Sequence, residues 1–184
     1  MQTTISSIIR GRRTIHNFQQ QPRPQREQII AAIEHAVCAP NHYNTEPWGF
    51  YLLGEETVER ICRLNAEQLR LERGDKAAEI KLLRWREIPG WMVMTCKRAE
   101  DPVQYMEDYA ACCCAAQNFM LYLWHEGVGV KWSTGPVTRE RQFYEILGID
   151  PDLESLVGLF WYGYPQDVPQ IEQKSHQQKL FELP

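Results

Sequence analysis

Three segments of this sequence carry side chains that could do chemistry. Arg12, Arg13 and Thr14 are consecutive, so two guanidinium groups and a hydroxyl could bind an anion such as a phosphate. Taken alone, the two arginines could equally be solvated surface charges. The loop 41–46 is rich in hydrogen-bonding side chains, and Ser-Thr-Gly at 133–135 ends an expected strand. Free backbone amides and a glycine at such a strand end allow a ligand to approach closely.

The common catalytic and metal-binding signatures are missing. Five histidines leave a hydrolytic arrangement possible, but no Gly-x-Ser-x-Gly turn occurs. His35 and His42 are separated by a proline and share neither a helix face nor the spacing of zinc ligands. No phosphate-binding loop of the Walker or Rossmann kind is present. We therefore expect no metal site and assign no catalytic side chain.

The cysteines predict a thiol-reducing compartment rather than a disulfide framework. Three of the six, Cys112, Cys113 and Cys114, are adjacent. On a helix such neighbours point about 100° apart, so they can neither cross-link one another nor converge on one zinc ion. We expect small, buried, apolar cysteines and a cytoplasmic protein.

Composition excludes further classes. The chain of 184 residues has 20 basic and 24 acidic side chains and a formal charge of −4, which argues against a nucleic-acid partner. No run of about 20 apolar residues and no charged-then-apolar leader occurs, so we expect neither a membrane span nor a secretion signal. The length fits a single domain over 1–184.

Hydrophobic spacing predicts an α+β fold. The segment 106–125 is apolar nearly all round, as expected of a central helix that other protein covers on most sides. Thr138 is expected to cap the last helix. Further helices are expected at 3–10, 29–37, 55–72 and 138–147, and strands at 47–53, 91–96, 128–134 and 155–164.

Two segments are less regular. The charged stretch 74–91 is interpreted as a mobile cover or lid, in which Trp85 and Trp91 either stack on a flat substrate or simply pack in the core. The polar tail from Pro165 cannot form a core of its own, but Leu180 and Phe181 could dock on a second subunit.

Five segments, in order along the chain, resemble motifs of the nitroreductase family. The segment 12–18 resembles its N-terminal Arg-Arg-Ser motif with threonine in place of serine, and 39–48 resembles its second motif, with Glu46 where the family usually has glutamine. The central helix 108–118, the strand and turn 130–135 and the closing strand 162–165 follow. The resemblance covers essentially the whole chain and is strongest to compact single-domain members.

The resemblance implies a nitroreductase-like fold, with a central, mostly antiparallel sheet flanked by helices, in an obligate homodimer. FMN would bind at the subunit interface, with both subunits contributing to each site and the C-terminal tail packing on the partner. NAD(P)H would be the co-substrate of a ping-pong reaction, and nitroaromatics, quinones and similar electron-poor compounds would be the acceptors. The flavin would carry the chemistry.

The resemblance also suggests which residues bind the cofactor. Arg12, Arg13 and Thr14 would hold the phosphate, with Lys174 as a further cation from the tail. His16 would lie near the pyrimidine edge of the ring, where reduction leaves negative charge, or else is a surface histidine after a turn. The amides of Ser133, Thr134 and Gly135 would lie near the reactive nitrogen. The remaining candidates are His42, then Asn44, which like Asn41 could instead be a turn residue, and Trp132, which could instead be a core residue.

Two other functions stay open. The fold and FMN could serve a flavin-binding or sensing module, or a specialised reaction such as dehalogenation, without general nitroreductase turnover. Alternatively, the cysteines at 112–114 could serve a thiol or zinc protein, although their spacing argues against this.

Overall fold

A computed structural model describes residues 4–172 and 179–183 of the chain. Its centre is a four-stranded sheet in the order β1-β2-β4-β3, and all three ladders are antiparallel. The central strands are long and almost fully buried, as expected where both faces are covered. The α+β prediction with an antiparallel sheet is therefore confirmed. The strands are β1 (Trp48–Leu52), β2 (Gly90–Lys97), β3 (Gly129–Ser133) and β4 (Glu154–Gly163).

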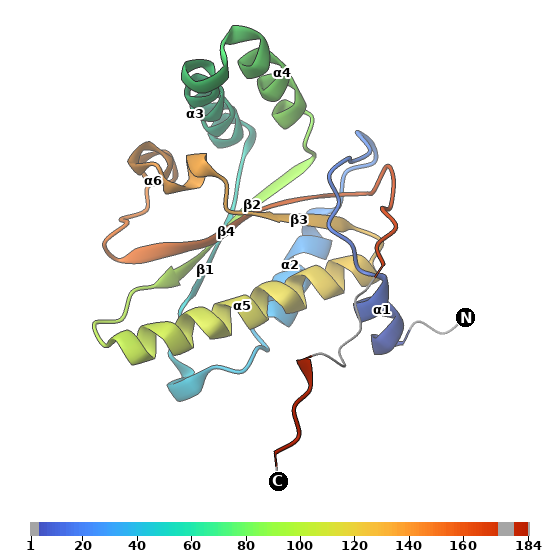
Figure 1. Ribbon diagram of the computed structural model, residues 1–184, viewed down its shortest axis with the longest axis vertical. Helices are drawn as coiled ribbons and strands as arrows, with labels where there is room; N and C mark the ends of the chain where they lie inside the picture. Colours follow the sequence, from blue (N-terminus) through green and yellow to red (C-terminus); the bar gives the residue numbers. More distant parts are fainter. Residues whose placement is uncertain (1–3, 173–178, 184) are drawn as a thin grey trace.

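Helices cover both faces of the sheet (Figure 1). One face packs against α2 (Arg26–Ala36) and the long α5 (Pro102–His125), and the opposite face lies under α3 (Glu55–Arg73), α4 (Asp75–Arg86) and α6 (Arg141–Leu147). The short α1 (Ile5–Gly11) lies against one end of α5. Two 3-10 turns, η1 (His42–Asn44) and η2 (Pro136–Arg139), complete the structure.

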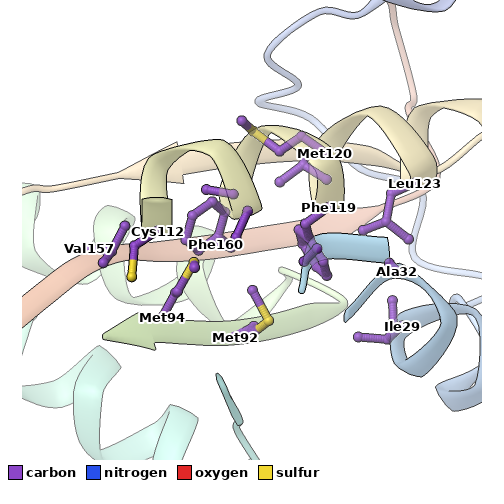
Figure 2. Packing of buried hydrophobic residues seen from close by; sticks show 14 of the residues in the cluster. Ile29, Ala32, Met92, Met94, Cys112, Phe119, Met120, Leu123, Val157 and Phe160 are labelled. Atoms are coloured by element: carbon purple, nitrogen blue, oxygen red, sulfur yellow. The ribbon is translucent and has the colours of Figure 1, made fainter. Parts of the chain in front are cut away.

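The α2–α5 face is packed mainly by apolar side chains (Figure 2). Phe119 of α5 and Phe160 of β4 meet edge to face with their ring centroids 6.0 Å apart, and Met92 and Met94 of β2 lie beside them in the same cluster. Small residues such as Ala115 let α5 approach the sheet closely. This side of the sheet is thus a continuous hydrophobic core.

The opposite face is built around three tryptophans. Trp85 of α4, Trp91 of β2 and Trp161 of β4 contact one another edge to face, with ring centroids 4.9–5.6 Å apart. All three are buried. The packing interpretation of Trp85 and Trp91 therefore holds, because Trp91 in particular is only 2% exposed and lies within the core.

The N-terminal segment extends the sheet beyond β3. Thr14 forms a parallel bridge to Val130, and the Ile15 amide donates to the Val130 carbonyl at 3.2 Å. Gly129 permits this approach, since a Cβ there would lie 2.4 Å from Ile15 Cγ1. The arginine turn is thereby placed at the start of β3.

One local prediction, the Thr138 cap, is wrong, whereas the interpretation of 74–91 as a lid stays a prediction. Thr138 does not cap the last helix, because it lies within η2, where its hydroxyl donates to the Gly135 carbonyl. The helix α6 begins after Glu140 instead. The stretch 74–91 is a defined helix, α4, followed by the start of β2; Gly74, with φ +81°, separates it from α3.

One side of α5 is uncovered in the single chain. Met106 is 65% exposed, and Ala110 and Cys114 are also exposed. The helix is apolar on this side as well. We expected other parts of the protein to cover α5 on most sides, and a single chain does so only in part. Such an exposed apolar surface is typical of an interaction site.

Candidate functional site

The arginine turn follows directly after α1. Arg13 donates from Nη1 to the carbonyls of Arg10 and Arg12, at 2.7 and 3.0 Å, and so also caps the helix end. Its Nε is buried and has no partner among the described residues. Burial, and then the charge of Arg13, lowers the pKa of Arg12. Two neighbouring cations thus share a half-buried position that an anion would stabilise.

Four basic side chains lie together farther along the chain, where α4 covers β3. The bridge at Thr14 carries the chain towards Lys131, and a cavity of about 240 Å³ is lined by His16, Lys81, Arg84 and Lys131 together with Trp161. We call these four basic residues the cationic cluster. The Lys131 ammonium lies over the Trp161 ring, 4.6 Å from its centroid, as in a cation–π contact.

The members of the cationic cluster repel one another. Burial, and then the charges of Lys81 and Arg84, lowers the pKa of Lys131. Burial, and then Lys131, lowers the pKa of His16, while Asp167 acts in the opposite direction. Both shifts reflect like charges that are crowded into one partly buried place. No carboxylate in the described part of the chain lies within 4.0 Å of these cations.

A larger cavity of about 500 Å³ adjoins the cationic cluster under the α3–α4 pair. Its floor includes Ser133 and Gly135 at the end of β3, and its walls include Trp85, Trp161 and the cations Lys81, Arg84 and Lys131. Shared residues make it continuous with the smaller cavity. We call it the α4 cavity. Its volume is typical of sites for small organic molecules, about 300–1,000 Å³.

The loop 41–46 is held in a strained shape at the other end of α5. Tyr43, Asn44 and Glu46 have φ of +60°, +51° and +45°, values that non-glycine residues adopt only when other contacts hold them. His42 Nδ1 lies 2.8 Å from Glu107 Oε2. Asn44 itself is exposed, and with His42 it forms the surface of this end of the molecule.

Thr45 anchors that loop to α5. Its hydroxyl donates to Asp108, a carboxylate only 4% exposed, while Asn41 donates to the Thr45 hydroxyl at 3.0 Å and accepts from the Glu46 amide at 2.8 Å. Buried hydrogen bonds to a charged group are among the stronger ones. These hydrogen bonds therefore hold the loop in a fixed position on α5.

The arginine turn and the loop 41–46 stand at opposite ends of α5 (Figure 1). A Cβ on Gly11 would lie 3.3 Å from Trp124 Nε1, whereas His42 contacts Glu107. With a rise of 1.5 Å per residue, the positions of Glu107 and Trp124 are about 25 Å apart. Within one chain, these two motifs cannot both contact one small ligand.

The predicted site residues thus form two groups. The first group follows β3: Arg12, Arg13 and Thr14 lie at the start of the strand and His16 beside Lys131, whereas Ser133, the exposed Thr134 and Gly135 lie at its far end. His42 and Asn44 lie elsewhere, and Lys174 falls outside the described residues. Trp132 fills the core: its indole N–H donates to the Val157 carbonyl at 3.0 Å and its ring stacks on Phe160.

Sequence reasoning missed Lys81, Arg84 and Lys131. Lys81 and Arg84 are spaced i, i+3 on α4, which places them on one helix face, and Lys131 alternates with Val130 and Trp132 along β3. Those periodicities were a usable signal. The sequence patterns do not show that α4 and β3 are neighbours, because only the folded structure brings them together.

Comparison with known proteins places this arrangement in a family. The model of the nitroreductase family matches residues 9–164, from α1 through the end of β4. The chain belongs to the nitroreductase family. The match includes the arginine turn, the loop 41–46, the α4 cavity and the strand end 133–135 in one continuous unit.

Individual members of the nitroreductase family resemble the chain along nearly its full length. It is 28% identical over 178 residues to YfhC of Bacillus subtilis (strain 168), provisionally named an NAD(P)H nitroreductase, covering 94% of this chain and 90% of that one. The structure of a nitroreductase-like family protein from Bacillus cereus has a TM-score of 0.87, 28% identity and coverage of 100% and 97%.

A provisionally named nitroreductase from Desulfovibrio desulfuricans, determined in complex with FMN, shares the fold. Its TM-score is 0.77 at 19% identity, with coverage of 100% of this chain and 99% of that one. At this identity the likeness concerns the fold.

No helix in the described ranges combines the length and the apolar character needed to cross a bilayer. Within 4–172 and 179–183, no three His, Cys, Asp or Glu side chains converge as metal ligands would.

Proposed function

We propose that this chain is an FMN-dependent NAD(P)H oxidoreductase that reduces nitroaromatics, quinones or similar electron-poor acceptors by a ping-pong reaction. The observation that carries the proposal is that a member of the nitroreductase family has two groups of basic side chains, the arginine turn at the start of β3 and the cationic cluster between β3 and α4. Among the described residues, no carboxylate lies within 4.0 Å of the cations in either group.

The arginine turn fits the phosphate of FMN. Arg12 is half-buried beside a second cation, Arg13 has a buried Nε without a described partner, and Thr14, the next residue, is half-buried as well. A phosphate dianion would neutralise both guanidinium groups and accept from all three residues. Lys174 as a further phosphate ligand stays a prediction.

The end of β3 fits the ring. His16 lies on one side of Lys131, and Ser133 to Gly135 leave the sheet where backbone amides are free to donate. These dipoles and charges would orient the ring and stabilise negative charge on it. Bound FMN would supply the hydride chemistry that no side chain of the protein can perform. The overall balance is NAD(P)H, a proton and a quinone giving NAD(P)⁺ and a quinol.

The α4 cavity would take the two substrates in turn. One opening beside Ser133 and Gly135 fits either a nicotinamide or an aromatic acceptor, so the first product must leave before the second substrate enters. The protein's part is to bind, to orient and to exclude water. No side chain is assigned as acid or base.

The separation of the two motifs along α5 supports a homodimer with shared sites. If His42 and Asn44 contact flavin, they reach the site of the other subunit, because their own arginine turn is about 25 Å away. The uncovered side of α5 and an apolar groove of about 410 Å³, lined by Ile5, Ile9 and Leu121 among others, are suited to a second copy.

The tail offers a further contact for that partner. Leu180 and Phe181 are 62% and 81% exposed, so we propose that the C-terminal end of the 1–184 domain packs on the other subunit. A cytoplasmic location stays a prediction from the cysteines, all of which are free among the described residues.

The test is the visible absorption spectrum of the purified protein, followed by steady-state oxidation of NADH and NADPH with a quinone or nitroaromatic. We expect a yellow protein that turns over with a parallel-line, ping-pong pattern. A colourless protein that refuses added FMN contradicts the proposal. A yellow dimer without turnover identifies instead a flavin-binding or specialised member.

A further inference from the structure

The α4 cavity carries more positive charge than a flavin ring requires. Lys81, Arg84 and Lys131 line it, and Arg73 lies at its rim beside Glu72, the carboxylate among its lining residues. The FMN phosphate is assigned to the arginine turn, so it does not neutralise these cations. An isoalloxazine ring is neutral when oxidised and carries at most one negative charge when reduced. Positive charge is therefore left over for a second ligand.

The walls of the same cavity are aromatic. Trp161 and Trp85 meet edge to face at 4.9 Å, and Lys131 and Lys81 lie over their rings at 4.6 and 5.5 Å. Trp161 is 4% exposed, and its indole N–H has no partner in the described part of the chain. Aromatic walls bordered by cations suit a flat aromatic ligand that carries negative charge.

The cavity also reaches the place where electrons are transferred. Ser133 and Gly135 belong to its lining, and they are the residues assigned to the reactive edge of the ring. A ligand whose anionic group binds the cations therefore has its ring held beside that edge. Such positioning raises the rate for ligands of the right charge.

We propose that the physiological acceptors are electron-poor aromatic compounds that carry an acidic group, and that Lys131, with Lys81 and Arg84, binds this group. The inference rests on the proposed function and names its substrate class. The phosphates of NAD(P)H share the same anionic chemistry, so the experiment must separate the donor from the acceptor.

The test compares 4-nitrobenzoate with its neutral counterpart 4-nitrobenzamide in the FMN-loaded dimer. We expect wild type to favour the acid in kcat/KM, and Lys131→Gln to lower the acid-to-amide ratio about tenfold, as for loss of one charge-assisted contact. Lys76→Gln removes the same charge from α4 outside the cavity and should leave the ratio unchanged. Arg84→Gln, on an exposed side chain, repeats the test if Lys131→Gln does not fold.

A second readout does not depend on turnover. Benzoate should quench tryptophan fluorescence of the FMN-loaded protein with a Kd that Lys131→Gln raises about tenfold, while benzamide shows no such dependence. Equal kcat/KM for acid and amide in wild type overturns the inference. So does a Lys131→Gln effect confined to the KM for NADPH, or one that lowers both acceptors equally. Failure of the proposed function is distinct, since neither acceptor would then be reduced.

Discussion

The two faces of the sheet are built for different purposes. Under α2 and α5, Met92, Met94, Phe119 and Phe160 belong to one continuous cluster of buried apolar side chains. Under α3 and α4, an equally buried set of tryptophans is bordered by Lys131 and Lys81 and by a cavity of about 500 Å³. Complete packing stabilises the first face, whereas the second gives up packing and keeps charges close together, which is the usual cost of a binding site.

The largest effect is expected on the fully packed face. Phe119→Ala removes a ring with no exposed surface and should lower the free energy of unfolding by about 3–5 kcal/mol, measured by urea denaturation. Leu71→Ala is the matched control, because Leu71 is 90% exposed on α3 and its loss should change stability by less than about 0.5 kcal/mol. Similar values for both variants would contradict the assignment of the core.

On the charged side, the expected loss is in ligand binding. Arg13→Ala removes charge-assisted hydrogen bonds to the phosphate, each worth about 1.5–3 kcal/mol, so the Kd for FMN should rise about ten- to hundredfold. Titration of the apoprotein, followed by flavin fluorescence, measures it. Arg10→Ala, one turn earlier on exposed α1, should bind FMN as wild type does; equal weakening in both would point to damage of α1.

Loss of the hydrogen bond between Thr45 and Asp108 should have an intermediate effect. Asp108→Ala and Thr45→Val each break the hydrogen bond between the loop 41–46 and α5. A double-mutant cycle on unfolding free energy should give a coupling of about 1–2 kcal/mol. Hydrogen exchange of the loop amides should rise in both variants. Additive effects with unchanged exchange would show that Asp108 does not hold the loop.

The smallest effect is expected where α3 and α4 are tied together at the surface. Hydrogen bonds from Arg86, and then Arg63, lower the pKa of Glu59 from 4.5 to about 2. A depressed carboxyl pKa stabilises the fold above its unfolded value, so this contribution should be lost as the pH falls from 4.5 towards 2. Because the pair is partly exposed, it should amount to less than about 1 kcal/mol.

Glu59→Gln tests that last contribution. The variant should lose stability at pH 7 and should show a correspondingly shallower decline between pH 4.5 and pH 2 than wild type, both followed by thermal denaturation. An unchanged pH profile would show that this ion pair does not contribute to the α3–α4 pair.

Periodicity was enough to predict most elements of the fold. The helices α2, α3 and α5 and all four strands lie where apolar spacing placed them, because burial on one or both faces leaves a direct pattern in the sequence. Thr138 misled the prediction of a helix cap, since the preceding proline starts a 3-10 turn instead. The helix α4 was hard to predict because apolar residues do not gather on one face of this charged stretch. Its only buried residues are Ala78 and Trp85.

The site was only partly predictable. Arg12 to Thr14 and Ser133 to Gly135 stood out as local motifs, and the fold brings them to the same edge. Lys131 joins Lys81 and Arg84 only through the sheet register and the α3–α4 pair, and no local pattern contains that information. The distance between the arginine turn and His42 likewise follows from the length of α5 rather than from either motif.

That distance gives the most direct test of the central claim, which is that each flavin site is built from two chains. One subunit carries Arg12→Ala with Arg13→Ala, the other His42→Ala with Asn44→Ala, and the mixed dimer is purified by two different tags. Each variant homodimer should fail to retain FMN on gel filtration, and the mixed dimer should retain one FMN per dimer, since one of its sites is wholly intact. A mixed dimer that retains none, while the wild-type dimer retains two, would contradict the account.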